Sequence, residues 1–216
     1  MRYHALVTDY DNTIAEYGAV KEKTIEALEK VRDSGRRLVL VTGRQLEDVL
    51  RIFSRFDLFD RVVAENGAVL YSPETREQRI LAESSGAEFT HALREAGIHP
   101  LAEGKVIVAT QRPNETKILE IIRDMGLELH VIFNHNAVMV LPSGVNKASG
   151  LEAALKDMGL SMHNSVGVGD AENDHAFLSI TECSVAVANA VDSVKKGADF
   201  VTTAEEGEGV VELVEQ

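Results

Sequence analysis

Ala5-Leu6-Val7-Thr8-Asp9-Tyr10-Asp11-Asn12-Thr13 begins with a short apolar run and then carries two carboxylates two residues apart. An apolar run of this length, without polar alternation, is typical of a strand that is covered on both faces, as in a parallel sheet. In an open α/β sheet, ligands bind at the carboxyl edge of such strands. Asp9 and Asp11 are therefore candidates for holding a hard cation, or for dividing nucleophilic and acid–base roles.

Outward from this stretch, short apolar runs alternate with amphipathic segments along the whole chain. The runs at residues 38–41, 62–63, 166–168 and 185–187 are mostly β-branched and predict further buried strands. Residues 46–53 and 151–158 have apolar positions at helical spacing, so each predicts a helix with one buried stripe. The alternation predicts an α/β fold, with a Rossmann-like core built on a parallel sheet.

The middle of the chain contains a complete set of elements of its own. Residues 84–144 predict a helix ending at Gly97, a strand near 106–109, a helix ending at Gly126 and a hairpin turning at 134–136. We therefore expect residues 1–83 and 145–216 to form the core and residues 84–144 to form a small inserted α+β cap. A cap over the edge of a sheet is where substrate selection and water exclusion are expected.

Polar groups also follow the other predicted strands. Thr42-Gly43-Arg44 places a hydroxyl and a glycine amide where a helix begins, which favours an anion such as phosphate. The stretch Gly169-Asp170-Ala171-Glu172-Asn173-Asp174 is another strand end rich in carboxylates. A calcium loop does not fit either acidic stretch, because neither has Gly at the sixth position and Glu at the twelfth. The nucleotide-binding glycine patterns are also missing.

Composition excludes several classes of function. The 216 residues carry a formal charge of −13, so we expect neither nucleic acid nor an anionic membrane as a partner. A single cysteine and seven scattered histidines argue against disulfides and against a transition-metal site. The N-terminus has no apolar signal core and no apolar run is long enough to span a membrane, which predicts a cytoplasmic protein. The glutamates at 205–208 are expected to lie in a solvated loop.

Taken in order, these segments resemble the four motifs of the haloacid dehalogenase superfamily, in particular its phosphatases with an aspartate nucleophile. The motifs are Asp-x-Asp-x-Thr from Asp9, Thr42-Gly43, Lys147 at the start of a helix, and Gly-Asp-x-x-Asn-Asp from Gly169. Glu65-Asn66-Gly67-Ala68 and the position of the insert resemble the subclass with an α/β cap, which includes Cof-like sugar phosphatases and archaeal phosphoglycolate phosphatases. One departure is Asn12, where the family often has Gly, but Asn tolerates the same turn.

The resemblance implies a role for each matching position. Asp9 would attack phosphorus to form an aspartyl phosphate, and Asp11 would act as the general acid and then the general base. Mg²⁺ would be bound by Asp9, by Asp170 and by the backbone carbonyl of Asp11, with Asp174 binding it directly or supporting its ligands. The cation is needed because a carboxylate and a phosphate dianion otherwise repel each other.

The same resemblance implies how the phosphoryl group would be held. Lys147 would supply a compact positive charge to Asp9 and to the phosphoryl oxygens. The oxygens would also be bound by Thr42, Gly43 and Asn173. Further candidates for contact with the substrate are Arg44, Asn66 and His135.

The expected activity is hydrolysis of a small phosphorylated metabolite, such as phosphoglycolate or a sugar phosphate. A phosphomutase with the same intermediate, and a binding module without turnover, remain alternatives. Asp11 favours hydrolysis, because relatives without an acid–base group there are not phosphatases. The cap composition does not identify the ester, and we expect a monomer or a homodimer.

Overall fold

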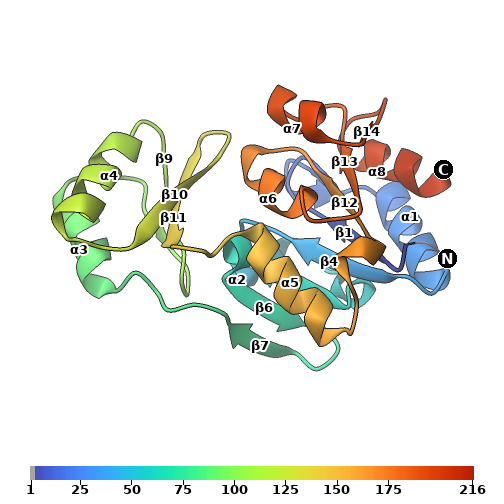
Figure 1. Ribbon diagram of the computed structural model, residues 1–216, viewed down its shortest axis with the longest axis horizontal. Helices are drawn as coiled ribbons and strands as arrows, with labels where there is room; N and C mark the ends of the chain where they lie inside the picture. The colour runs from blue at the N-terminus through green and yellow to red at the C-terminus, as the bar shows by residue number, and fades with distance from the viewer. Residues whose placement is uncertain (1–2) are drawn as a thin grey trace.

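The computed structural model describes residues 3–216, and the chain forms two lobes, each built on its own sheet (Figure 1). In this described part, the larger sheet has eight strands in the order β14-β13-β12-β1-β4-β5-β6-β7. These strands are β1 (Ala5–Thr8), β4 (Arg37–Val41), β5 (Arg61–Ala64), β6 (Val69–Ser72), β7 (Glu77–Ile80), β12 (Ser165–Gly169), β13 (Cys183–Ala186) and β14 (Phe200–Val201). A small hairpin, β2 (Ala15–Glu16) with β3 (Ala19–Val20), follows β1.

The predicted α/β fold is confirmed. β1 pairs in parallel with both β4 and β12, and all four of its residues are buried. A strand with a neighbour on each side and a layer on each face has no solvated surface, which explains its run of apolar residues.

The edge of the sheet differs from a purely parallel arrangement, because β6 and β7 pair antiparallel to their neighbours. The turn Glu65–Gly67 reverses the chain within three residues, with Glu65 and Asn66 both at φ 51°. A reversal this tight joins antiparallel strands, whereas parallel neighbours need a long crossover.

Helices cover the larger sheet in pairs that lie side by side. α1 packs against α8 at the right of Figure 1, and α5 packs against α6. The bounds are α1 (Glu22–Asp33), α2 (Leu46–Ile52), α5 (Lys147–Asp157), α6 (His175–Leu178), α7 (Asp192–Gly197) and α8 (Glu206–Glu215).

The solvated loop expected at 205–208 is wrong, because α8 begins there. Gly207 is buried, and a Cβ on it would lie 2.3 Å from Thr24 Oγ1 of α1. The charged run therefore contains the close contact between two helices, which charge counting does not reveal.

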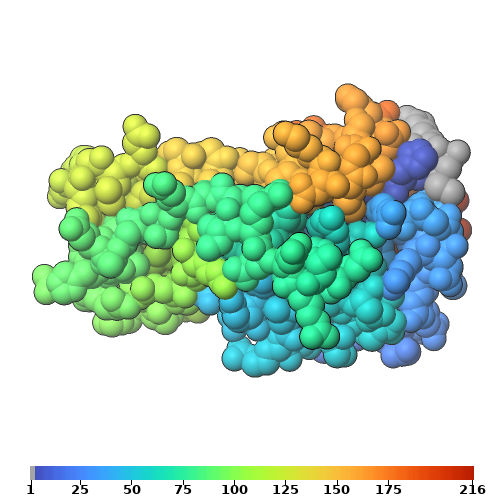
Figure 2. All heavy atoms as spheres, turned by 90° about the horizontal axis from the view of Figure 1, so that it is seen from below, coloured from blue at the N-terminus to red at the C-terminus, as the bar shows by residue number. Residues whose placement is uncertain are grey.

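The smaller lobe contains a four-stranded sheet in the order β10-β11-β9-β8, with two helices on it. Its elements are α3 (Ala87–Glu95), β8 (Ala102–Glu103), β9 (Val108–Gln111), α4 (Glu115–Asp124), β10 (Leu129–Asn134) and β11 (Ala137–Pro142). Phe89 and Leu93 of α3 and Ile118 of α4 pack with Val108 and Val138 of the sheet in a separate small core. Figure 2 shows this lobe in contact with the larger one. The proposed domain bounds at 84 and 144 stay a prediction, although every strand of the smaller sheet lies between them.

The strand expected at 106–109 is shifted by two residues, because β9 begins at Val108. The backbone N–H groups of Val106 and Ile107 donate to the side chain of Glu65 and therefore do not pair in a ladder. Within residues 3–216, no helix has the length and apolar character needed to cross a membrane.

Candidate active site

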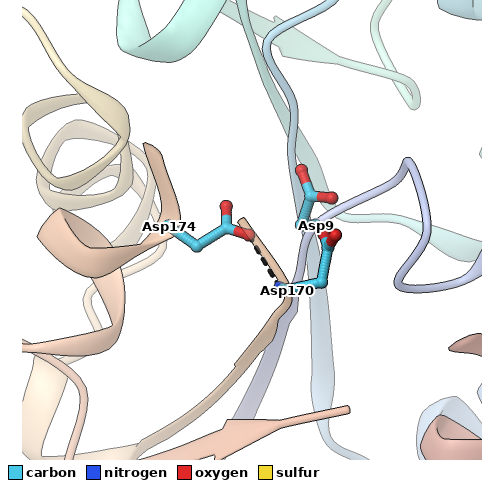
Figure 3. Close-up of side chains that lie close together, drawn as sticks. All are labelled: Asp9, Asp170 and Asp174. Atoms are coloured by element: carbon cyan, nitrogen blue, oxygen red, sulfur yellow. Dashed lines mark hydrogen bonds between the residues drawn. The ribbon is translucent and has the colours of Figure 1, made fainter. Parts of the chain in front are cut away.

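Three carboxylates meet at the carboxyl edge of the larger sheet (Figure 3). Asp9 follows β1, and its backbone N–H donates to the carbonyl of Val168 in β12 over 3.0 Å. Asp170 follows β12 itself, and Asp174 lies at the end of the helical turn Glu172–Asp174. One oxygen from each of the three lies within 4.8 Å of the others, and their residues are only 4%, 1% and 0% exposed. The parallel pairing of β1 with β12 therefore brings together residues 161 positions apart.

Lys147 is the cation inside this cluster. It is the first residue of α5, and Asn146 caps that helix by accepting from the N–H groups of Ala148 and Ser149. Lys147 Nζ lies 2.5 Å from Asp9 Oδ1 and 2.5 Å from Asp174 Oδ1. The helix start therefore aims one buried ammonium group between two buried carboxylates.

Burial and charge shift the pKa values of this cluster strongly. Burial alone would lower the pKa of Lys147, but Asp174 and Asp9 outweigh it and raise the pKa above its ordinary value. Burial raises the pKa of Asp170 to about 6, assisted by the charge of Asp174. Burial also raises the pKa of Asp9, against the opposing effect of Lys147. Burial is the main cause of both carboxylate shifts, and the three carboxylates of the cluster also outnumber the single lysine between them.

This donor set fits a hard divalent cation. Carboxylate oxygens are the ligands that Mg²⁺ and Ca²⁺ prefer, and a cation at this edge would offset the uncompensated charge of Asp9 and Asp170. Asp174 is already engaged at both oxygens, since Oδ2 accepts from the N–H groups of Asp170 (2.8 Å) and Ala171 (2.9 Å). Its geometry therefore favours orienting Lys147 and the loop after β12.

The candidate phosphate-binding residues lie beside the cluster. Thr42 is buried directly after β4, and its hydroxyl accepts from the backbone N–H of Arg44 at 3.1 Å. A Cβ on Gly43 would lie 3.3 Å from the side-chain amide of Asn66 and 3.5 Å from that of Asn173. Asn173 donates to Asn66 Oδ1 at 2.8 Å. The turns after β4 and β5 and the turn before α6 therefore bring these polar groups into contact.

Asp11 and Arg44 form a pair at the rim of this site. Arg44 donates from Nε and one terminal nitrogen to the two oxygens of Asp11, over 2.7 and 2.6 Å. Arg44, a candidate for substrate contact from the sequence, is therefore paired with an acid of the core. The Asp11 carboxylate is outside the three-carboxylate cluster.

The cap reaches the site through the turn of the β10–β11 hairpin. His135 has φ 48°, which fits the predicted turn of residues that tolerate positive φ. Its Nε2 lies 3.2 Å from Asp170 Oδ2, and its backbone N–H donates to Glu172 Oε2 at 3.2 Å. His135 therefore lies directly against the carboxylate cluster.

Two contributors had no role assigned from the sequence. Thr13 Oγ1 donates to Asp170 Oδ1 at 3.1 Å, and its place in the Asp-x-Asp-x-Thr pattern was the available signal. Glu65 is fully buried and accepts backbone N–H groups of the cap. No spacing rule identifies such a carboxylate, although it belongs to the Glu65–Ala68 segment singled out above.

Comparison with known proteins finds a matching family and relatives of similar length. A family model described as haloacid dehalogenase-like hydrolase matches residues 6–120 and 104–214. Phosphoglycolate phosphatase of Methanothermobacter thermautotrophicus is 31% identical, over 97% of this chain and 96% of its own length. The protein of the same name from Methanobrevibacter smithii is 28% identical, over 100% of this chain and 99% of its own.

Solved structures share the fold. A crystal structure from Thermoplasma acidophilum aligns with a TM-score of 0.84 at 16% identity, covering 100% of this chain and 98% of that one. A putative HAD/Cof-like hydrolase from Plasmodium vivax aligns with a TM-score of 0.85 at 21% identity, covering 99% and 95%.

Proposed function

We propose that this chain, which belongs to the haloacid dehalogenase-like hydrolases and is a phosphatase, hydrolyses a small phosphomonoester with Asp9 as the nucleophile. The observation that carries the proposal is the buried contact of Asp9 Oδ1 with Lys147 at 2.5 Å. Within the described residues, no side chain donates to the other oxygen of Asp9. One oxygen is therefore held while the other is available to attack phosphorus, which forms an aspartyl phosphate.

Asp11 is proposed to carry the proton. It would protonate the leaving oxygen of the ester and then remove a proton from the water that attacks the aspartyl phosphate. The two hydrogen bonds from Arg44 fix the orientation of its carboxylate, so closure on a substrate has to turn Asp11 toward the leaving group or bring that group to it. Thr42, Gly43, Asn173 and Lys147 would bind the phosphoryl oxygens as their negative charge is redistributed.

Mg²⁺ is the proposed cofactor. Asp9, Asp170 and the backbone carbonyl of Asp11 would hold it, and Asp174 would support them through its contacts with Lys147 and the loop after β12. When bound, the ion neutralises charge shared between the nucleophile and the phosphate dianion.

The substrate is proposed to be phosphoglycolate or a short sugar phosphate. The names of the relatives at 31% and 28% identity support phosphoglycolate. His135 of the hairpin turn contacts Asp170, and we propose that His135, Asn66 and Arg44 contact the substrate. A phosphomutase remains the second candidate because it would use the same intermediate. A monomer or homodimer and a cytoplasmic location stay predictions from the sequence.

Phosphate release tests this proposal. The wild type is assayed on a panel of phosphomonoesters with Mg²⁺ and with excess EDTA, beside Asp9→Asn and the exposed control Asp33→Asn. We expect metal-dependent release from the wild type and the control, and at least a thousandfold loss in Asp9→Asn, since the covalent step is removed. Comparable rates in Asp9→Asn and the wild type would refute a role for Asp9 as nucleophile.

A further inference from the structure

Glu65 makes a contact with the cap that the proposed chemistry does not use. It lies in the turn after β5, is 0% exposed, and its carboxylate accepts three consecutive backbone N–H groups. Oε1 accepts from Lys105 at 3.0 Å, and Oε2 accepts from Val106 at 2.9 Å and from Ile107 at 3.0 Å. Hydrogen bonds to an ionised group are about twice as strong as neutral ones, and losing the acceptor would leave buried donors unpaired.

The loop at residues 104–107 is folded closely around this carboxylate. Gly104 N–H donates to the carbonyl of Ile107 at 2.8 Å, which closes the loop. A Cβ on Gly104 would lie 2.6 Å from the carboxyl carbon and from one oxygen of Glu65. Only glycine therefore allows the loop to approach this closely.

The same residue is tied to the phosphate-binding turn. The backbone N–H of Glu65 donates to the carbonyl of Arg44 at 2.9 Å, and that of Asn66 donates to the carbonyl of Thr42 at 3.0 Å. Glu65 and Asn66 both have left-handed backbone, which non-glycine residues adopt only where surrounding contacts hold them. Glu65 therefore joins the cap loop to the turn that is proposed to bind phosphate.

The contact at the hairpin turn is of a different kind. His135 is exposed and makes two contacts here: its backbone N–H donates to the exposed Glu172 at 3.2 Å, and its Nε2 lies 3.2 Å from Asp170 Oδ2, with 46% of the His135 side chain exposed. Contacts made by an exposed side chain exchange with water at less cost than three buried hydrogen bonds to one carboxylate. Motion of the cap is thus expected to open the hairpin turn first and to leave the Glu65 contact in place.

We propose that Glu65 is a positioning residue: it fixes loop 104–107 to the phosphate-binding edge and thereby sets how the cap fits the leaving group of the substrate. Its effect on catalysis rests on the proposed function, while its effect on the loop does not. Glu65 does not contact the reacting atoms, so it acts through the cap. Loss of the Glu65 carboxylate therefore affects the substrates whose binding depends on the fit of the cap.

The test compares Glu65→Gln with Glu47→Gln. Glu47 also contacts this loop, through Lys105 Nζ at 2.8 Å, but its side chain is 59% exposed, so the control removes the same charge from the same neighbourhood. Backbone amide exchange is followed in peptides covering 104–109 and, as an internal standard, 165–169 of β12. Steady-state kinetics are measured with phosphoglycolate and with para-nitrophenyl phosphate, whose chemistry needs no fit to the cap.

In Glu65→Gln we expect exchange at 105–107 to accelerate about tenfold or more, with β12 unchanged, because the side-chain amide is uncharged and turns an NH2 donor toward at least one of the three N–H groups. We expect KM for phosphoglycolate to rise about tenfold while kcat and the aryl phosphate kinetics change by about threefold or less. Gly104→Ala, which disturbs the contact from the cap side, is expected to reproduce the same pattern.

The proposal is overturned if Glu65→Gln and Gly104→Ala match Glu47→Gln in both exchange and kinetics. Equal acceleration at 104–109 and in β12 would also overturn it, because that result shows only a general loss of stability. A wild type without activity on either ester would refute the proposed substrates, and the exchange data would still decide whether Glu65 fixes the loop.

Discussion

Replacing Lys147 with methionine is expected to destabilise the protein by about 3–5 kcal/mol at neutral pH without divalent cations. The magnitude follows from burial: the side chain of Lys147 is 1% exposed, and those of its partners Asp9 and Asp174 are 5% and 0% exposed. Exposed ion pairs contribute only about 0–1 kcal/mol because water screens them. Here methionine fills a similar volume and leaves two buried carboxylates without their cation, so the full cost of unpaired buried charge applies.

The free energy of unfolding is measured by urea denaturation in buffer with EDTA, with the wild type and Lys156→Met alongside. Lys156 lies on the same helix, α5, but is exposed, so its replacement should change the free energy by about 0.5 kcal/mol or less. For a chain of this size, about 2–4 °C of melting temperature corresponds to 1 kcal/mol, so the expected drop is about 6–20 °C.

A loss below about 1 kcal/mol in Lys147→Met, with an unchanged dependence on urea concentration, would refute this reasoning. It would mean that the two contacts of 2.5 Å contribute no more than surface pairs do. Such a result would also remove the main support for Lys147 as the group that orients Asp9.

Three further outcomes are expected. Arg44→Lys should lower kcat about tenfold and alter the pH–rate profile, because lysine does not reproduce the two hydrogen bonds that orient Asp11; an unchanged profile would contradict this. Saturating Mg²⁺, at about 100 times its Kd, should stabilise the wild type by about 2.7 kcal/mol in thermal or urea unfolding, and Asp170→Asn should lose most of this effect. The backbone N–H and the hydroxyl of Ser184 donate to Asp199 and hold the pKa of the Asp199 carboxyl below the ordinary 3.8. The ionised carboxylate therefore stabilises the folded protein above about pH 4, and this stabilisation is lost as pH falls through the lowered pKa. Asp199 is exposed, so water screens this interaction, and Asp199→Ala should be less stable than the wild type at pH 7 by only about 0.5 kcal/mol, with the difference narrowing below pH 4; a constant difference would argue against this linkage.

Local sequence patterns were sufficient to predict the main layers of the fold. The apolar run before Asp9 and the one before Asp170 predicted two buried strands whose ends carry carboxylates, and the structure pairs these strands in parallel. Glycines at 97 and 126 marked the ends of the cap helices and both have positive φ. These features are local, because burial on both faces and a left-handed residue each leave a signature in neighbouring residues.

Elements that depend on distant partners were missed or shifted. β6 and β7 pair antiparallel at the edge of the sheet, where all four residues of β7 are exposed and two of the four in β6 are buried, which leaves little apolar pattern. The start of β9 was wrong by two residues because Glu65, about 40 positions away, takes the N–H groups that a strand would use. The expected loop at 205–208 was wrong because the close approach to Thr24 of α1 makes Gly207 of α8 part of a helix interface.

The sequence by itself determined which residue types stand at the strand ends, since Asp9, Thr42 and Asp170 each follow a recognisable apolar run. Only the tertiary structure decided their partners: Lys147 between two carboxylates, Arg44 on Asp11, and His135 against Asp170. The physical reason is that periodicity along the chain reports burial, whereas the charge state and orientation of a buried group depend on donors and charges brought near it by strand pairing and helix packing.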